Sequence, residues 1–166
     1  GMEESGVQLP VGPLMKPKVK LLIYDTYLKA IKNSVGSNLF RNLYLVKNGK
    51  RIDALNNGQL SCAVFVSWVL RIFYLIREGH ATVDGAMKDL KKSGWYKIKK
   101  PKIGAILVWE DIFLNGSLNK HIGFYIGNKE AVSNSRSKKT PVKHHWTYGG
   151  KRKVEIILWN NKLDRL

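Results

Sequence analysis

Apolar residues recur at helical spacing in three segments of the first half of the chain. Residues 19–36 have the period of an amphipathic helix, and residues 82–94 predict another, capped by Thr82 and ended by Gly94. Between them, residues 61–77 are apolar on nearly every side, and the length of this segment favours a helix over a strand. A helix that is apolar all round belongs in the centre of a domain, so we expect this helix to be the central one.

The second half of the chain changes to short β-type runs separated by turn residues. After Pro101 these runs are IGAILVW, HIGFYIG, EAVSN and VEIILW. A small hairpin is also predicted earlier in the chain, because Asn48-Gly49 between two short apolar runs is a strong turn signal. Helices therefore precede strands, and this order predicts an α+β fold in which N-terminal helices pack on a C-terminal antiparallel sheet.

The first residues of the chain differ from the rest. Residues 1–18 contain several prolines and glycines and show neither helical nor strand periodicity. We therefore predict a flexible arm, followed by a single domain over residues 19–166. Gly1 before Met2 is typical of a tag remnant, and the early acidic residues without an apolar stretch predict no signal peptide. No run of about 18 apolar residues occurs, so no transmembrane segment is predicted.

Composition adds a strong basic bias to this picture. Of the 166 residues, 44% are apolar, which suffices for the core of one compact domain. Lys and Arg number 29 against 12 Asp and Glu, giving a net charge of +17, for which the candidate partners are nucleic acid, anionic membrane surfaces and acidic cell-wall polymers. Because the basic residues are spread out and form no continuous basic helix, a generally solvated basic surface is favoured over dedicated nucleic-acid binding.

Cys62 is the one cysteine of the chain, so an internal disulfide, a CxxC redox site and a cysteine-based zinc cluster are all excluded. With Ser61 as the predicted N-cap, Cys62 lies in the first turn of the central helix. Unpaired N–H groups and the positive end of the helix dipole favour a nucleophilic thiolate there. The alternative is a small apolar side chain that starts a buried helix.

His121 is the candidate base. In the predicted strand KHIGFYIGN, His121, Gly123 and Tyr125 share one face, and the apolar residues share the other. Glycine between two larger rings allows another backbone to approach, and we expect the helix that presents Cys62 to use this gap. The alternative is a solvated histidine at the mouth of a strand.

A third polar residue should orient the imidazole. The strand EAVSN follows the turn after the histidine strand, so it returns antiparallel and brings Ser133 or Asn134 beside His121. Asn134 is the better chemical choice because its amide oxygen can accept the imidazole N–H, whereas strict alternation favours Ser133.

His144 and His145 are adjacent, and neighbours on a strand point to opposite faces, so they make a poor metal pair. One of them, His144, is a candidate for lining a cleft. The sequence has no HExxH, phosphate-binding loop or GxGxxG motif, so we expect neither a metal nor a cofactor.

Three segments in the order LSCAVFVSWVL, KPKIGAILVWE and HIGFYIGNKEAVSNS resemble the NlpC-like branch of the papain-fold cysteine peptidases, a branch of cell-wall hydrolases. The resemblance covers residues 55–135, and its most specific part matches His121, Gly123, Tyr125 and Gly127. It implies a Cys–His–polar triad that hydrolyses amide bonds in peptidoglycan stem peptides.

Carried onto this sequence, the resemblance implies Cys62 as nucleophile, His121 as general base and, by spacing, Ser133 as the third residue. The chain departs from the family pattern next to the nucleophile, where Ser61 replaces the usual Asp and Ala63-Val64 replaces Ser-Gly. The upstream Tyr of the family has only a distant candidate in Tyr44. Residues expected at the oxyanion hole or substrate cleft are Ser61, Gln59, Tyr125 and His144.

Together these observations predict a papain-like cysteine peptidase or amidase acting on peptide or peptidoglycan-like substrates. Two alternatives stay open: an acyltransferase or lipid hydrolase on the same fold, and a non-catalytic basic binding module with a degenerate triad.

Overall fold

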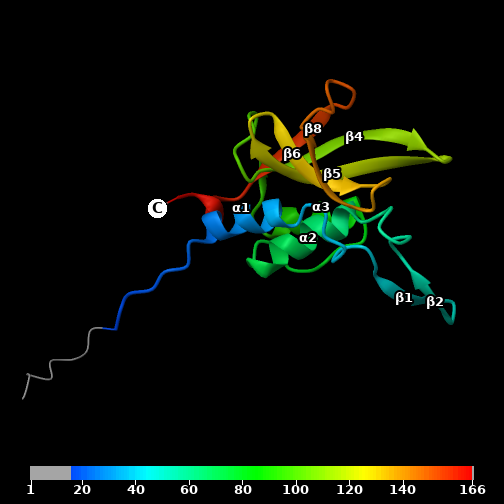
Figure 1. Ribbon diagram of the computed structural model, residues 1–166, viewed down its shortest axis with the longest axis horizontal. Helices are drawn as coiled ribbons and strands as arrows, with labels where there is room; N and C mark the ends of the chain where they lie inside the picture. Colours follow the sequence, from blue (N-terminus) through cyan, green and yellow to red (C-terminus); the bar gives the residue numbers. More distant parts are fainter. Residues whose placement is uncertain (1–15, 166) are drawn as a thin grey trace, which may run out of the picture.

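The computed structural model describes residues 16–165 and has an α+β fold, as the order of helices and strands predicts. The helices lie on one side of a six-stranded antiparallel sheet, and a separate two-stranded hairpin projects beside them (Figure 1). In chain order the elements are α1 (Ile23–Asn33), β1 (Tyr44–Lys47), β2 (Lys50–Asp53), α2 (Cys62–Ile72), α3 (Val83–Lys92), β3 (Tyr96–Lys97), β4 (Ile106–Leu114), β5 (Ser117–Gly127), β6 (Glu130–Ser135), β7 (Thr140–His145), β8 (Val154–Trp159) and the 3₁₀ turn η1 (Asn161–Leu163).

The large sheet has the strand order β3-β8-β4-β5-β6-β7, and every neighbouring pair is antiparallel. In this register Trp109 of β4 lies opposite His121 of β5, and Ser133 of β6 lies opposite Gly123. Side chains alternate between the two faces of a strand, so His121, Gly123 and Ser133 share one face of the sheet.

The two faces of the sheet have different cores. On the helical face Phe65 of α2 packs edge-on against Phe124 of β5, with ring centroids 5.3 Å apart. On the opposite face, Leu107, Trp109 and Ala131 form a smaller buried cluster. The body of α2 therefore packs on the face opposite to His121, whereas its first residue, Cys62, reaches the histidine strand beside Ile122.

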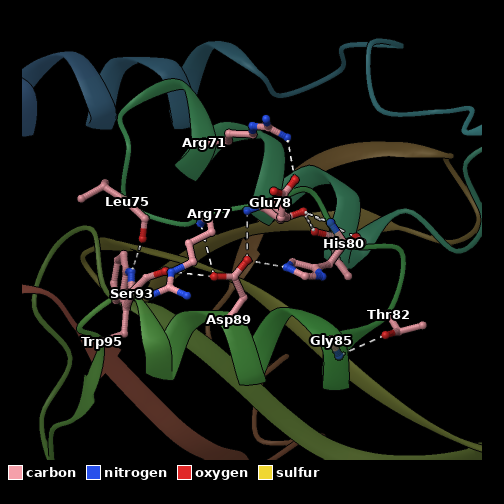
Figure 2. Close-up of polar contacts among 12 residues, drawn as sticks. Arg71, Leu75, Arg77, Glu78, His80, Thr82, Gly85, Asp89, Ser93 and Trp95 are labelled. Atoms are coloured by element: carbon pink, nitrogen blue, oxygen red, sulfur yellow. Dashed lines mark hydrogen bonds and ion pairs between the residues drawn. The ribbon is translucent and has the colours of Figure 1, made fainter.

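Local turn and cap chemistry explains the elements that the sequence predicts. Asn48 and Gly49 both have positive φ, 50° and 73°, which confirms the predicted hairpin between β1 and β2. Thr82 caps α3 by accepting a hydrogen bond from the N–H of Gly85 (Figure 2).

The central helix is shorter than the predicted span of residues 61–77. It ends at Ile72, Tyr74 takes a φ of 55°, and the N–H of Leu75 donates back to the carbonyl of Leu70. Leu75 and Ile76 are buried although they lie beyond the helix. Apolar character thus marks these residues as core, but it does not specify their backbone.

Asp89 of α3 holds the connection between α2 and α3 in place (Figure 2). Its carboxylate accepts hydrogen bonds from the backbone N–H groups of Arg77 and Glu78 and from the hydroxyl of Ser93. His80 Nε2 lies 2.6 Å from the same carboxylate. Burial opposes ionisation of Asp89, but these hydrogen bonds outweigh it and lower the pKa of the carboxyl.

The short strand β3, the outer part of the β4–β5 hairpin and strand β7 were not predicted from the sequence. The β4–β5 hairpin extends to a turn at Asn115-Gly116, whose positive φ values of 50° and 80° are those of the Asn-Gly turn between β1 and β2. Strand β7 is an edge strand, and Pro141 is tolerated there because an edge leaves some backbone N–H groups unpaired.

At the start of the described chain, residues 16–18 are exposed and belong to no helix or strand. The rest of the predicted arm, residues 1–15, lies outside the described residues. None of the helices within residues 16–165 combines the length and apolar character needed to cross a bilayer.

Candidate active site

Cys62 begins α2 and lines a cleft of about 1000 Å³ that His121 also lines. Its side chain is half-buried. The backbone N–H groups of Ile122, Ala63 and Cys62 itself lie close enough to the sulfur to favour its charged form. Because Ile122 directly follows His121 in β5, the first turn of α2 and the histidine strand meet at this cleft.

The pKa of the Cys62 thiol is raised, because burial disfavours the thiolate. The nearby backbone N–H groups and the positive charge of Arg152 act in the opposite direction without outweighing burial. The start of the helix thus favours the thiolate, as the sequence predicts, but burial has the larger effect on the pKa. At neutral pH the thiol keeps its proton and needs a base to release it.

His121 lies on the sheet face opposite α2, where its ring packs against Trp109 with centroids 5.1 Å apart. The sequence predicted that the helix carrying Cys62 would approach at Gly123. Instead, Ser133 and Trp109 occupy the space beside this glycine. A Cβ at this position would lie 2.7 Å from Ser133 Cβ and 3.0 Å from the Trp109 ring. Glycine is therefore required here by the packing of the neighbouring strands.

A hydrogen-bonded group surrounds the hydroxyl of Ser133. This oxygen lies 2.9 Å from Nε2 of His121, 2.7 Å from Nε2 of His144 and 3.2 Å from the Tyr148 hydroxyl. The ring of Tyr148 stacks on that of His144, with centroids 4.1 Å apart. Nδ1 of His144 lies 2.7 Å from the carbonyl oxygen of His145.

These partners assign the protons of both imidazoles. A carbonyl only accepts, so neutral His144 carries its proton on Nδ1, and its Nε2 accepts from the Ser133 hydroxyl. Ser133 has then donated its one proton, so it accepts from Nε2–H of His121 and from Tyr148. Neutral His121 is left with an unprotonated Nδ1, which enters no hydrogen bond within residues 16–165.

Burial lowers the pKa of His121 to about 3, and the positive charge of Arg152, with that of His144 when it is protonated, acts in the same direction. Burial also lowers the pKa of His144. Both rings are therefore neutral at pH 7. The resting site combines a neutral thiol with a neutral imidazole whose Nδ1 is free to take a proton.

The orienting contact predicted for Asn134 is made by its neighbour Ser133. Asn134 points to the other face of β6 and donates from Nδ2 to the carbonyl of Gly58 at 2.8 Å. Strict alternation of side chains along the strand decided this outcome, because His121 and Ser133 share a face.

The other predicted cleft residues have different positions. Gln59 lines the cleft, with its side-chain oxygen accepting from Asn56. Ser61 is fully buried at the N-cap position, and its hydroxyl has no hydrogen-bond partner among the described residues. Tyr125 packs against Trp146 instead of lining the cleft.

His144 contacts Ser133 rather than the cleft, and Tyr44 lies on the β1–β2 hairpin, where Arg51 covers its ring. The aromatic residue that does line the cleft is Tyr148, in the turn after β7. The segment WTYGGKRK has no hydrophobic period and carries turn residues, so the sequence gives no signal for this position.

Arg152 is the second residue that sequence reasoning missed. It lines the cleft, but in the sequence it is one of 29 basic residues and nothing distinguishes it. For the described chain, no three side chains of His, Cys, Asp or Glu stand close enough together to hold a metal ion.

The sequence matches no known protein family, and no curated protein resembles it at a significant level. The chemistry of the cleft therefore rests on the residues that line it.

Proposed function

We propose that this protein is a cysteine hydrolase of the papain-like type that cleaves amide bonds in peptide or peptidoglycan-like substrates. One observation carries the proposal: Cys62 at the start of α2 lines the same cleft as His121, whose Nδ1 is unprotonated and unoccupied. The resemblance of the segments around Cys62, His121 and Ser133 to the NlpC-like cysteine peptidases supports the same reaction class.

In the proposed reaction, His121 Nδ1 accepts the thiol proton of Cys62 as the sulfur attacks the amide carbonyl carbon. Backbone N–H groups in the first turn of α2 stabilise the oxyanion that forms. The imidazolium then gives its proton to the leaving amine, and a thioester remains on Cys62. Water, deprotonated by His121, hydrolyses the thioester and restores the neutral pair.

The hydrogen-bond chain through Ser133 serves this reaction by keeping one tautomer of His121. When His121 gains a proton on Nδ1, its Nε2–H continues to donate to Ser133. Ser133 is therefore the proposed third residue of the site. His144 and Tyr148 hold its hydroxyl in place.

The lining of the cleft combines charged and apolar side chains. Charged side chains of both signs line it, namely Asp84, Asp111, Lys120, Arg136, Lys151 and Arg152. Apolar side chains, among them Ile112, Leu114 and Leu118, line the same cleft, so an acyltransferase or lipid hydrolase on the same fold remains the second candidate. The protein has a net charge of +17. We expect this basic surface to bind anionic cell-wall polymers.

Alkylation of Cys62 by iodoacetamide tests the proposal, because this is the one cysteine of the chain and the label reports on a single site. At pH 7 we expect His121→Ala to lower the second-order rate constant by about tenfold or more, since general-base assistance is lost. The assistance should persist at pH 5, because His121 loses its basic nitrogen only as the pH falls through about 3. Mass spectrometry of the labelled protein gives the rate.

Two controls separate base catalysis from unfolding. Cys62→Ala should take up no label, and above the pKa of the thiol the wild type and His121→Ala should react at similar rates because the thiolate forms without help. Equal rates for the two proteins at pH 7, with the circular dichroism spectrum preserved, would reject His121 as the base and favour a non-catalytic basic module.

A further inference from the structure

Arg152 is held in the cleft by backbone carbonyls. Its Nε and Nη2 donate to the carbonyl oxygen of Glu110 at 3.1 and 2.9 Å, and Nη2 also donates to the carbonyl of Asn119 at 2.8 Å. These hydrogen bonds come from β4 and β5, the strands beside the histidine site. They fix the plane of the guanidinium without neutralising its charge.

The charge of Arg152 has no carboxylate partner within ion-pair distance among residues 16–165. None of the hydrogen bonds in this part of the chain uses its Nη1. A half-buried cation normally takes a bidentate carboxylate when one is available, because Coulomb attraction strengthens away from water. Here Glu110 and Asp111 act on the charge only from beyond ion-pair distance, and the guanidinium stays open to the cleft.

Arg152 and the nucleophile also share their surroundings. Arg152, Cys62, His121 and Tyr148 line the same cleft. The positive charge of Arg152 lowers the pKa of both Cys62 and Tyr148, although burial raises both overall. A group bound to Arg152 would therefore lie close to the bond that Cys62 attacks.

We propose that Arg152 binds a carboxylate of the substrate, so that the enzyme prefers amide substrates that carry a carboxylate beside the scissile bond. This inference rests on the proposed function and narrows its substrate class. A free peptide C-terminus and an acidic side chain both supply this group. The planar fork of an arginine suits either one, and a fixed orientation favours two parallel hydrogen bonds.

The charge on an alkylating reagent tests the site without a known substrate. Iodoacetate carries a carboxylate, and iodoacetamide is its neutral analogue. The quantity measured is the ratio of the rate constants for alkylation of Cys62 by iodoacetate and by iodoacetamide. Arg152→Gln should lower this ratio by about tenfold, because it removes a unit charge a few ångströms away. Arg152→Lys keeps the charge and should retain most of the ratio. Lys162→Gln removes an exposed charge outside the cleft and should change the ratio by less than about twofold.

A measurement on the wild type needs no variant and separates the two sources of carboxylate. N-acetylalanine carries a free C-terminal carboxylate and should slow labelling by iodoacetate, whereas the neutral N-acetylalanine amide should not. The α-amide of N-acetylaspartate carries only a side-chain carboxylate, and it should slow labelling only if Arg152 also accepts acidic side chains. The proposal is overturned if the ratio is the same in wild type and Arg152→Gln, or if neither carboxylate compound protects more than the neutral amide.

The outcome is distinguishable from that of the catalytic test. If His121→Ala leaves iodoacetamide labelling unchanged while Arg152→Gln lowers the reagent ratio, the carboxylate site stands and the hydrolase proposal fails. If His121→Ala slows labelling and the ratio does not respond to Arg152, the hydrolase proposal stands and the carboxylate preference fails.

Discussion

Burial and hydrogen-bond partners shift the pKa values of the side chains at the cleft. The pKa of the Cys62 thiol is raised because burial outweighs the N–H groups around it, so the thiol stays protonated at neutral pH. His121 is a neutral ring with a free Nδ1, because burial disfavours its charged form and Ser133 accepts its Nε2–H. A neutral pair of this kind depends on the orientation of the imidazole more than an ion pair would.

Ser133→Ala tests this orientation. The change removes the acceptor of His121 Nε2–H and the donor to His144, so the ring can adopt the other tautomer or turn. We expect the rate constant for alkylation of Cys62 at pH 7 to fall by about tenfold, part of the general-base contribution. The rate is measured with iodoacetamide, as for His121→Ala.

Asn134→Ala is the matched control, because the two residues are neighbours in β6. It should keep the alkylation rate within about threefold of wild type. It should lower the free energy of unfolding by about 1–3 kcal/mol, since the buried carbonyl of Gly58 loses its donor. The opposite pattern, with slow alkylation in Asn134→Ala and not in Ser133→Ala, would return the third position to Asn134.

At the scale of elements, the path from α2 to α3 depends on one buried carboxylate. The segment after α2 forms no regular helix or strand. The carboxylate of Asp89 therefore accepts the hydrogen bonds of the backbone N–H groups of Arg77 and Glu78. His80 is therefore a partner of Asp89 in the fold and not a ligand at the cleft (Figure 2).

Asp89→Ala should lower the free energy of unfolding by about 2–4 kcal/mol, measured by urea denaturation at pH 7, because several buried donors lose their acceptor at once. Asp84→Ala is the matched control in the same helix. Its side chain is exposed, with a long contact of 4.0 Å to Lys120, so we expect a change below about 0.5 kcal/mol. Equal losses in the two variants would contradict the structural role of Asp89.

The whole molecule carries a net charge of +17, and its ion pairs within the described residues are few and mostly exposed. Repulsion among like charges opposes the compact state and is screened by salt. The charge therefore affects both stability and the choice of partner.

We expect the midpoint of thermal unfolding to rise by several degrees between about 20 and 300 mM NaCl. The comparison protein replaces the exposed Lys97, Lys99 and Lys100 by Glu, which lowers the net charge. Its midpoint should respond less to the same change in salt. Differential scanning calorimetry measures both, and a midpoint that falls with added salt in the wild type would contradict the argument.

Much of the fold could be predicted from periodicity and turn chemistry, because these depend on residues close together in sequence. The helices around residues 23–33 and 83–92 follow from apolar spacing and from the Thr82 cap. Cys62 and His121 were also recognisable, one at a helix start and one on the polar face of a strand. The Asn115-Gly116 pair is the same local turn signal as Asn48-Gly49, so this turn is also encoded locally.

What the sequence by itself determined is therefore the α+β class, the helix that begins at Cys62 and the face of the strand that carries His121. The tertiary structure alone decided the length of α2, the choice of Ser133 over Asn134, and the protonation of Cys62 and His121. It also brought Tyr148 and Arg152 to the cleft. These features arise from strand register, burial and contacts between residues far apart in the chain, and no local pattern of residues encodes them.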